Sequence, residues 1–523
     1  MKKLVTMLLA LLLALSAMPG CVAGLAEGEY KDTIVWVIGN DQDILDPQMN
    51  VSNSKVIPQF YDGLLGFDAN NNIVCKIAES YESSEDGMVW TFHLRDDVYF
   101  HSGRHCTAHD FEVTFDRLLD EENPVRYTTN YDYIESAVAT DDYTFVITLG
   151  EPKAFFLQSI AKHQTAVLNP EYIEKYGADL GETAESVDGC GPFKCTSWEK
   201  GEEMRFERFD DYYGDVAKTK EIVMMIVPEQ TSRAIALETG QADIADGVSP
   251  DDAVRLDALD GITVSKTDGS GCHLWQFNCA SDDTPVSDPR VRQAISYAID
   301  KETICEYLYS GLEETPIRSV MPPFVAGYSD VGVVPYDVEK AKELLAEAGY
   351  PDGFEMTVMT TAVYNRGVEM GEIIVEMLGE VGITVNLEVV ERAVFNSAWG
   401  GFTPEEFNAN FGWDMFIMGS GGDADADTLL YRIMHTDDTN INNYGFYSNA
   451  EVDELLEKGA VTMDEEERNA IYKRIAEITL YEDPFGVYVN YRKNVYALSD
   501  NIENFAVSPM NTMDLANIVC RAD

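Results

Sequence analysis

The chain has 523 residues, and its 37 Lys and Arg are outnumbered by 92 Asp and Glu, which gives a net charge of −55 at neutral pH. Nucleic acids and anionic membranes bind proteins through surplus basic side chains, so this balance excludes both as direct partners. Because 45% of the residues are hydrophobic, the chain can bury a large core and is not expected to be disordered. Its carboxylates should lie mostly on the surface and favour amine-bearing partners.

The N-terminal segment is predicted to be an export signal. Two lysines precede an apolar run over residues 4–18, which is shorter than the roughly 20 residues of a membrane-spanning helix. Cleavage before Cys21 would remove residues 1–20 and leave a lipidated cysteine, whereas cleavage after Ala26 would remove residues 1–26. The mature protein is therefore expected outside the cytoplasm, as a lipoprotein on the outer face of the cytoplasmic membrane or as a periplasmic protein.

Strand and helix patterns alternate along the rest of the chain. Runs of β-branched and aromatic residues predict strands at residues 33–38, 89–94, 144–149, 355–360, 384–390, 413–418 and 487–490. Apolar spacing and capping residues predict helices at residues 111–119, 155–160, 171–176, 231–239, 288–298, 338–348, 368–381 and 465–481. This alternation predicts the α/β class.

A cluster of His101, His105, Cys106 and His109 holds residue types that bind transition metals. Gly103 interrupts the cluster, so these side chains do not share one helix face. We therefore interpret the segment as an ordinary turn before a helix, and keep His105 and His109 as weak metal candidates.

The segment Gly419-Ser-Gly-Gly-Asp423-Ala-Asp425-Ala-Asp427 combines glycines with alternating carboxylates. Three interpretations stay open from the residues alone. The carboxylates could hold Ca²⁺, although the glycine and glutamate spacing of an EF-hand is missing. They could bind the ammonium group of a ligand, or they could form an Asx-rich turn that closes a strand.

Catalytic signatures for a serine, metal or phosphate-transfer enzyme are missing from the sequence. This favours a binding protein, and an exported hydrolase remains the alternative of another class.

Nine segments in collinear order resemble one known family. They lie at residues 43–47, 61–68, 77–81, 90–101, 107–110, 189–194, 287–300, 336–349 and 444–453. The run Ser-Asp-Pro-Arg-Val-Arg-Gln-Ala-Ile-Ser-Tyr-Ala-Ile-Asp at 287–300 is the most specific of these. Together they are similar to the family-5 extracytoplasmic solute-binding proteins of peptide-type ABC transporters, which include oligopeptide, dipeptide and nickel binders.

The resemblance implies a two-lobed, hinge-closing α/β fold of the periplasmic-binding-protein type II with an extra domain, in which helices flank mixed sheets. It also implies these domain bounds: domain I at residues 31–62, 190–272 and 495–523, domain II at 63–189, and domain III at 273–494. The implied function is to capture short peptides between the lobes and deliver them to an ABC permease and, through it, to its ATPase. A nickel chelate, an oligosaccharide or another solute is the alternative ligand.

The resemblance further implies a non-enzymatic monomer without a cofactor, attached to the membrane only by the possible lipid anchor at Cys21. In peptide-binding members an aspartate after the glycine-rich turn takes the ligand ammonium, and Asp423 matches that position best. Asp425 is the second candidate, because the segment is one residue short and lacks the usual proline. Arg366 lies where some dipeptide binders hold the ligand carboxylate. Candidate pocket walls are Tyr127, Trp275, Asn278, Trp399 and Trp413.

Overall fold

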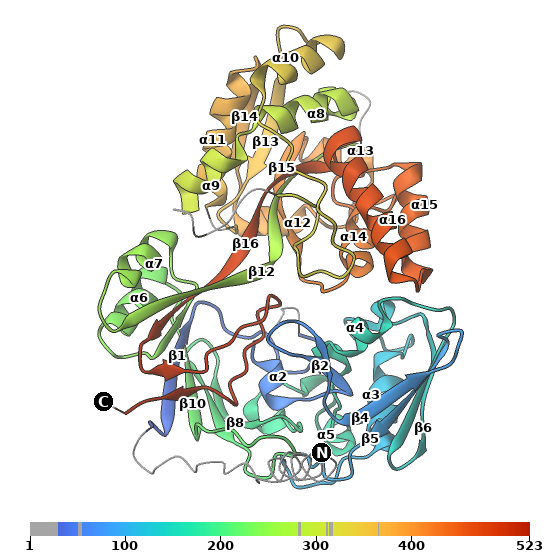
Figure 1. Ribbon diagram of the computed structural model, residues 1–523, viewed down its shortest axis with the longest axis vertical. Coiled ribbons are helices and arrows are strands. Elements are labelled where there is room, and N and C mark those ends of the chain that lie inside the picture. The colour runs from blue at the N-terminus through green and yellow to red at the C-terminus, as the bar shows by residue number, and fades with distance from the viewer. Residues whose placement is uncertain are drawn as a thin grey trace, which may run out of the picture.

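The chain forms two lobes joined by two long strands (Figure 1). This computed structural model describes residues 30–50, 55–280, 284–309, 312, 317–364 and 366–522. The expected export signal and Cys21 lie outside the described residues.

Domain I lies in the lower lobe of Figure 1 and uses one half of a ten-stranded mixed sheet. Its strand order is β8-β9-β10-β1-β11, in which β1 is parallel to both of its neighbours. The strands are β1 (Thr33–Ile38), β8 (Phe193–Glu199), β9 (Glu203–Arg208), β10 (Glu221–Ile226) and β11 (Ile244–Asp246). The other elements are α2 (Ile57–Phe60), α6 (Gln230–Glu238), α7 (Pro250–Asp257), β17 (Ile502–Glu503) and β18 (Val519–Cys520). Alternate residues of β1, including Trp36, face the main core of this domain.

Domain II occupies the other side of the lower lobe and has its own antiparallel sheet in the order β4-β5-β7-β6. The strands are β4 (Ala78–Ser83), β5 (Val89–Leu94), β6 (Ile134–Asp141) and β7 (Thr144–Leu149), beside the pair β2 (Leu65–Phe67) and β3 (Ile73–Cys75). The helices are α3 (Ala108–Leu118), α4 (Phe156–Ile160) and α5 (Pro170–Tyr176). A capping box between Thr107 and Asp110 starts α3, and Phe111 and Phe115 of this helix pack on Phe145 of the sheet.

Domain III forms the upper lobe around the strand order β14-β13-β15-β12-β16. Its own strands are β13 (Glu355–Thr360), β14 (Thr384–Val389) and β15 (Met415–Gly421). Its helices are α8 (Pro289–Ala298), α9 (Lys301–Tyr309), α10 (Val338–Glu347), α11 (Gly367–Gly379), α12 (Arg392–Ser397), α13 (Pro404–Asn410), α14 (Ala426–Met434), α15 (Ala450–Val461) and α16 (Glu465–Glu477). Two cores cover the two faces of this sheet, one with α8 to α11 and one with α14 to α16.

The lobes are joined by β12 (Ile262–Phe277) and β16 (Gly486–Ser499), which run antiparallel through both. Their pairing shifts register between Asp268 and Cys272, and again between His273 and Leu274. A Cβ added to Gly269 would lie 2.6 Å from the Arg492 carbonyl oxygen, so only glycine fits this close approach. A register shift locally disrupts the ladder and bends the strand. Because both strands pass between the lobes here, we call this segment the hinge.

The structure confirms the α/β class with helices flanking mixed sheets. The observed elements differ from the predicted ones where tertiary contacts determine where a strand or helix ends. The strand predicted at 413–418 is β15, which continues through Gly421 because its glycines pair with β12. The helix predicted at 465–481 ends at Glu477 and continues as a π-helical turn (Ile478–Glu482). Within the described residues, no helix combines the length and the apolar character needed to cross a membrane.

Candidate functional site

The two lobes touch at several points across their junction. The Lys162 ammonium of domain II forms an ion pair with the Asp423 carboxylate of domain III. The Ala154 N–H of domain II donates a hydrogen bond to the Ala460 carbonyl of domain III over 3.1 Å. Binding sites in two-lobed folds lie at such a junction, because closing the lobes removes water from both sides of a ligand.

Asp423 reaches the junction because β15 ends in glycines. Gly421 and Gly422 have φ of 146° and 100°, which favour glycine. A Cβ on Gly421 would also lie 2.1 Å from the Ser270 carbonyl oxygen of β12. The chain therefore turns sharply after Gly422 and presents the Asp423 side chain, 17% exposed, toward Lys162.

Asp425, the second candidate for the ligand ammonium, is used inside domain III. Its side chain is 1% exposed and accepts two hydrogen bonds from Arg468, over 2.7 and 2.8 Å. It also caps α14 by accepting the N–H of Asp427. We correct the prediction on this ground: both carboxylate oxygens already have partners, and Asp425 anchors the turn that positions Asp423.

Asp427 completes this buried cluster. It is 5% exposed and accepts a hydrogen bond from the Tyr472 hydroxyl over 3.2 Å. Burial and the neighbouring Asp425 charge raise the pKa of Asp427 to about 7. The alternating aspartates therefore have different roles, since only Asp423 faces the opposite lobe.

Arg366 lies at the junction with domain I, but its guanidinium is already engaged. It forms ion pairs with Asp251 of α7 over 2.7 Å and with Glu369 of its own helix over 3.2 Å. A guanidinium whose charge and N–H donors are already used by two carboxylates is poorly suited to bind a third. The structure therefore gives Arg366 a contact between lobes instead of the predicted contact with a ligand carboxylate.

Three of the predicted pocket walls belong to the core of domain III. Trp275 is fully buried, and Trp413 is 2% exposed and donates from its indole to Glu388 over 2.8 Å. Asn278 donates to the Trp413 carbonyl and to the Asn408 side chain. These three side chains are held by packing and hydrogen bonds, which corrects their prediction as pocket walls. In domain II, Tyr127 donates its hydroxyl to the Asn50 carbonyl over 2.6 Å.

Trp399 does line a recess, which has a volume of about 200 Å³. It lies at the edge of β15, because β13 pairs with β15 only at Met415 and Phe416. We call this cavity the aromatic recess, and its walls include Tyr364, Phe395, Trp399 and Tyr444, with Arg432 and the Met418–Gly421 backbone. Sequence reasoning missed Tyr364, although Tyr364 is two residues from the candidate Arg366.

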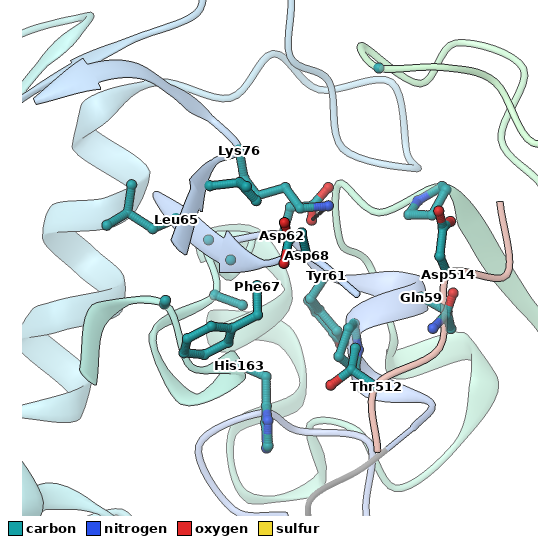
Figure 2. Close-up of a pocket in the computed structure, with 18 of the residues that line it drawn as sticks. Gln59, Tyr61, Asp62, Leu65, Phe67, Asp68, Lys76, His163, Thr512 and Asp514 are labelled. Carbon is teal, nitrogen blue, oxygen red and sulfur yellow. Dashed lines mark ion pairs between the residues drawn. The ribbon is translucent and has the colours of Figure 1, made fainter. Parts of the chain in front are cut away.

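A second cavity of about 550 Å³ lies between domains I and II, and Lys162 and Gly422 line it on either side of the lobe junction. The Asp62 carboxylate at its wall is 5% exposed and accepts hydrogen bonds from the hydroxyls of Tyr212 and Tyr213 over 2.8 and 2.9 Å. Figure 2 shows Lys76 with its amino end beside Asp62, and the two form an ion pair over 3.5 Å. We call this space the junction cavity.

The junction cavity also contains His163, which follows Lys162. Burial lowers the pKa of His163 to about 4, so this imidazole is neutral at physiological pH. None of these cavity residues was a predicted site residue, although residues 61–68 were among the segments that carried the family resemblance.

The histidine cluster is spread over separate contacts. The partly buried His101 contacts the Gly191 carbonyl over 3.0 Å, and His105 contacts the Asp96 carbonyl over 2.9 Å. His109 is exposed, 3.5 Å from Glu112 and from Asp142. The described residues include no group of three or more metal-binding side chains placed to hold one ion.

A match to a protein-family model shows which family this two-lobed chain belongs to. The model of the bacterial extracellular solute-binding proteins, family 5 Middle, matches residues 72–441. The chain belongs to this family. It is thus a solute-binding protein of the group that serves ABC importers, and its place of action is outside the cytoplasm.

Individual relatives of this solute-binding protein span almost its whole length. The glutathione-binding protein GsiB of Escherichia coli (strain K12) is 28% identical over 508 residues, covering 96% of each chain. The structure of the ABC transporter-associated periplasmic binding protein DppA from Helicobacter pylori, in complex with peptide STSA, is 27% identical with a TM-score of 0.79, covering 94% of this chain and 99% of that one. The structure of AgaA from A. tumefaciens R10, in complex with agropinic acid, is 28% identical with a TM-score of 0.76, covering 94% and 99%.

Proposed function

We propose that this solute-binding protein captures short peptides at the lobe junction and that Asp423 binds their terminal ammonium group. The observation that carries the proposal is the ion pair across the junction. Asp423 already pairs with one ammonium group, that of Lys162, so its carboxylate is placed to pair with a ligand ammonium instead. A peptide that enters from solvent would take the place of Lys162.

Charge pairing is what makes this position selective. A buried ammonium without a partner carries a desolvation cost of several kcal/mol, so a closed site must offer it a carboxylate. Asp423 is suited to this, because its turn is anchored from behind by the pairing of Asp425 with Arg468. A ligand without an amine would leave Asp423 paired with Lys162 and would have to bind elsewhere.

The backbone of the ligand has a matching surface on β15. Beyond Phe416, the edge of β15 that faces the aromatic recess has no paired strand among the described residues. An extended peptide can add to such an edge by main-chain hydrogen bonds, which are independent of side-chain identity. Side chains of an extended peptide alternate in direction, so they can enter the aromatic recess or the junction cavity. The junction cavity, at about 550 Å³, is within the usual size of ligand sites.

Two relatives support a peptide over other solutes. GsiB is described as a glutathione-binding protein and DppA was crystallised with the peptide STSA, and both ligands are peptides. AgaA was crystallised with agropinic acid, so a non-peptide solute is the alternative ligand that the experiment must test.

We further propose that the protein acts as a monomer without catalysis, that it hands its ligand unchanged to an ABC permease and its ATPase, and that Cys21 is lipidated. The mass of the mature N-terminus decides between lipidation and cleavage after Ala26.

Calorimetry with di-, tri- and tetraalanine tests the proposal. Each peptide is compared in its free form and with an acetylated N-terminus, and we expect binding of the free forms only. Asp423→Asn should weaken binding of the free peptides by at least about thirtyfold, as expected for one half of a buried charge pair. The exposed Asp438→Asn is the matched control. Equal binding of free and acetylated peptides would refute the role of Asp423, and chromatography of the recovered peptide checks that it is intact.

A further inference from the structure

Arg492 stands out among the arginines of the described chain. It lies on β16 in the hinge and is half-buried, and its buried Nε has no hydrogen-bond partner. Its guanidinium also has no ion pair with any described residue. Among the described residues, Arg233 is the only other arginine that is not exposed and forms no ion pair with a carboxylate. Unlike Arg492, Arg233 donates hydrogen bonds to four backbone carbonyls. An arginine held half-buried without a partner is costly, and in a chain of charge −55 it is unexpected.

The Arg492 guanidinium, on β16, lies against the backbone of Gly271 on β12. A Cβ added to Gly271 would lie 1.9 Å from Nη2 and 2.5 Å from Nε of Arg492. The guanidinium therefore occupies the space that any other residue at 271 would fill. The next residue, Lys493, forms an ion pair with Asp268. The two neighbouring cations on β16 therefore differ, because Lys493 contacts a carboxylate and Arg492 contacts none among the described residues.

Strand pairing places Arg492 beside the proposed peptide site. Gly271 is paired with Gly421, and His273 is paired with Gly419. Directly paired residues of antiparallel strands share a face of the sheet. Arg492 covers Gly271, and the Tyr364 ring covers Gly419, where an added Cβ would lie 3.0 Å from it. One pair, Cys272 with Ser420, separates the two covered positions, so Arg492 and Tyr364 lie on the same face of the sheet. Burial raises the pKa of Tyr364, and the nearby Arg492 charge acts in the opposite direction. This effect agrees with the short distance between the two side chains.

The spacing of opposite charges matches a short peptide. Asp423 follows Gly421 by two residues, which span at most about 7 Å, and the paired Gly271 is about 5 Å from Gly421. The Asp423 backbone is therefore within about 12 Å of the Gly271 backbone that the Arg492 guanidinium covers, a distance that an extended peptide of about three residues can span. Of the other cations near the junction, Lys162 pairs with Asp423 and Arg366 pairs with Asp251, whereas Arg432 at the aromatic recess is exposed to solvent.

We propose that Arg492 binds the terminal carboxylate of the ligand whose ammonium Asp423 binds, so that the site selects short zwitterionic peptides. This inference rests on the proposed function and names a residue for the opposite end of the ligand. A planar guanidinium can take a carboxylate in a bidentate manner. Because Arg492 lies on a hinge strand, the ligand would connect the hinge to the turn after β15.

The test uses the full-length mature protein and three probes: alanylphenylalanine, its C-terminal amide and its N-acetyl form. We expect the wild type to bind the amide at least about tenfold more weakly than the free dipeptide. Arg492→Gln should bind the free dipeptide and the amide equally, both weakly, and Arg492→Lys should recover part of the preference. Arg392→Gln, at an exposed arginine, should behave like the wild type. Thermal unfolding checks that each variant is folded.

The outcomes separate this inference from the proposed function. If the acetylated dipeptide fails to bind while the free form and the amide bind equally to the wild type, Asp423 keeps its role and the role of Arg492 is refuted. If Arg492→Gln keeps the wild-type preference against the amide, the inference is also refuted. If the acetylated form binds as well as the free one but the amide does not, the proposed role of Asp423 fails and the assignment of Arg492 stands.

Discussion

Lys162 and Asp423 form an ion pair that joins domain II to domain III. The two residues are separated by 261 positions in the sequence, and each is mostly buried, with side-chain exposures of 22% and 17%. If Asp423 binds the ligand ammonium as proposed, Lys162 is an internal competitor of the ligand. In that case the Asp423 carboxylate stays neutralised until a ligand with an amine replaces the lysine.

Removing the competitor should tighten binding. We expect Lys162→Met to bind free peptides up to about fivefold more strongly, because a partly exposed ion pair contributes up to about 1 kcal/mol. Isothermal titration calorimetry at low salt measures the change, and Lys200→Met, at an exposed lysine, is the control. Weaker binding in Lys162→Met would show that Lys162 supports the ligand or the closed lobes instead.

Breaking the anchor behind Asp423 should destabilise domain III. Arg468→Met leaves the Asp425 carboxylate buried without its bidentate partner, and we expect a loss of about 3–5 kcal/mol in the free energy of unfolding. Denaturant unfolding followed by circular dichroism measures it. Arg474→Met removes a more exposed arginine of the same helix and should cost less than about 1 kcal/mol. Equal effects of the two changes would contradict the anchoring role.

Asp427 should make stability depend on pH. Its folded pKa is raised to about 7 from 3.8 by burial and by Asp425. Because the folded state binds this proton more tightly than the unfolded state, its contribution is fully present below pH 4 and is lost as pH rises through 7. Asp427→Asn should remove this loss and melt at a higher temperature than the wild type at pH 8. Calorimetric melts at pH 4.5 and pH 8 check this, and an identical pH profile for both proteins would contradict it.

The contact between Gly271 and Arg492 predicts a selective defect. Gly271→Ala places a methyl group where the guanidinium lies, so Arg492 must move while the strand remains. Moving one flexible side chain costs about 1–3 kcal/mol in the free energy of unfolding, and the preference for a free carboxylate over the amide should disappear. Calorimetry and thermal unfolding measure both effects. Gly379→Ala, where an added Cβ meets open space, should leave both unchanged, and retained selectivity in Gly271→Ala would contradict the assignment.

Local elements were largely predictable because their signals are local. The strand at 33–38 and the helix opened by the Asp337 cap are observed as β1 and α10, apart from one residue at the end of the helix. The end of β15 was not predictable, because glycines favour turns and these are held extended by pairing with β12. The same limit applies to Trp275 and Trp413, since an aromatic residue in a core and one in a pocket wall have the same local pattern.

The sequence by itself determined the strongly acidic charge, the α/β class and the family. It also located the short glycine-aspartate segment in which the ligand-binding carboxylate was expected. Only the tertiary structure decided which aspartate faces the opposite lobe, because Arg468, which engages Asp425, is 43 residues away in sequence. Only the tertiary structure paired Lys162 with Asp423 and placed Arg492 over Gly271 with no hydrogen-bond partner for its Nε among the described residues. The physical reason is that the charge partners of a buried group come from distant segments, and local spacing carries no information about which segments will meet.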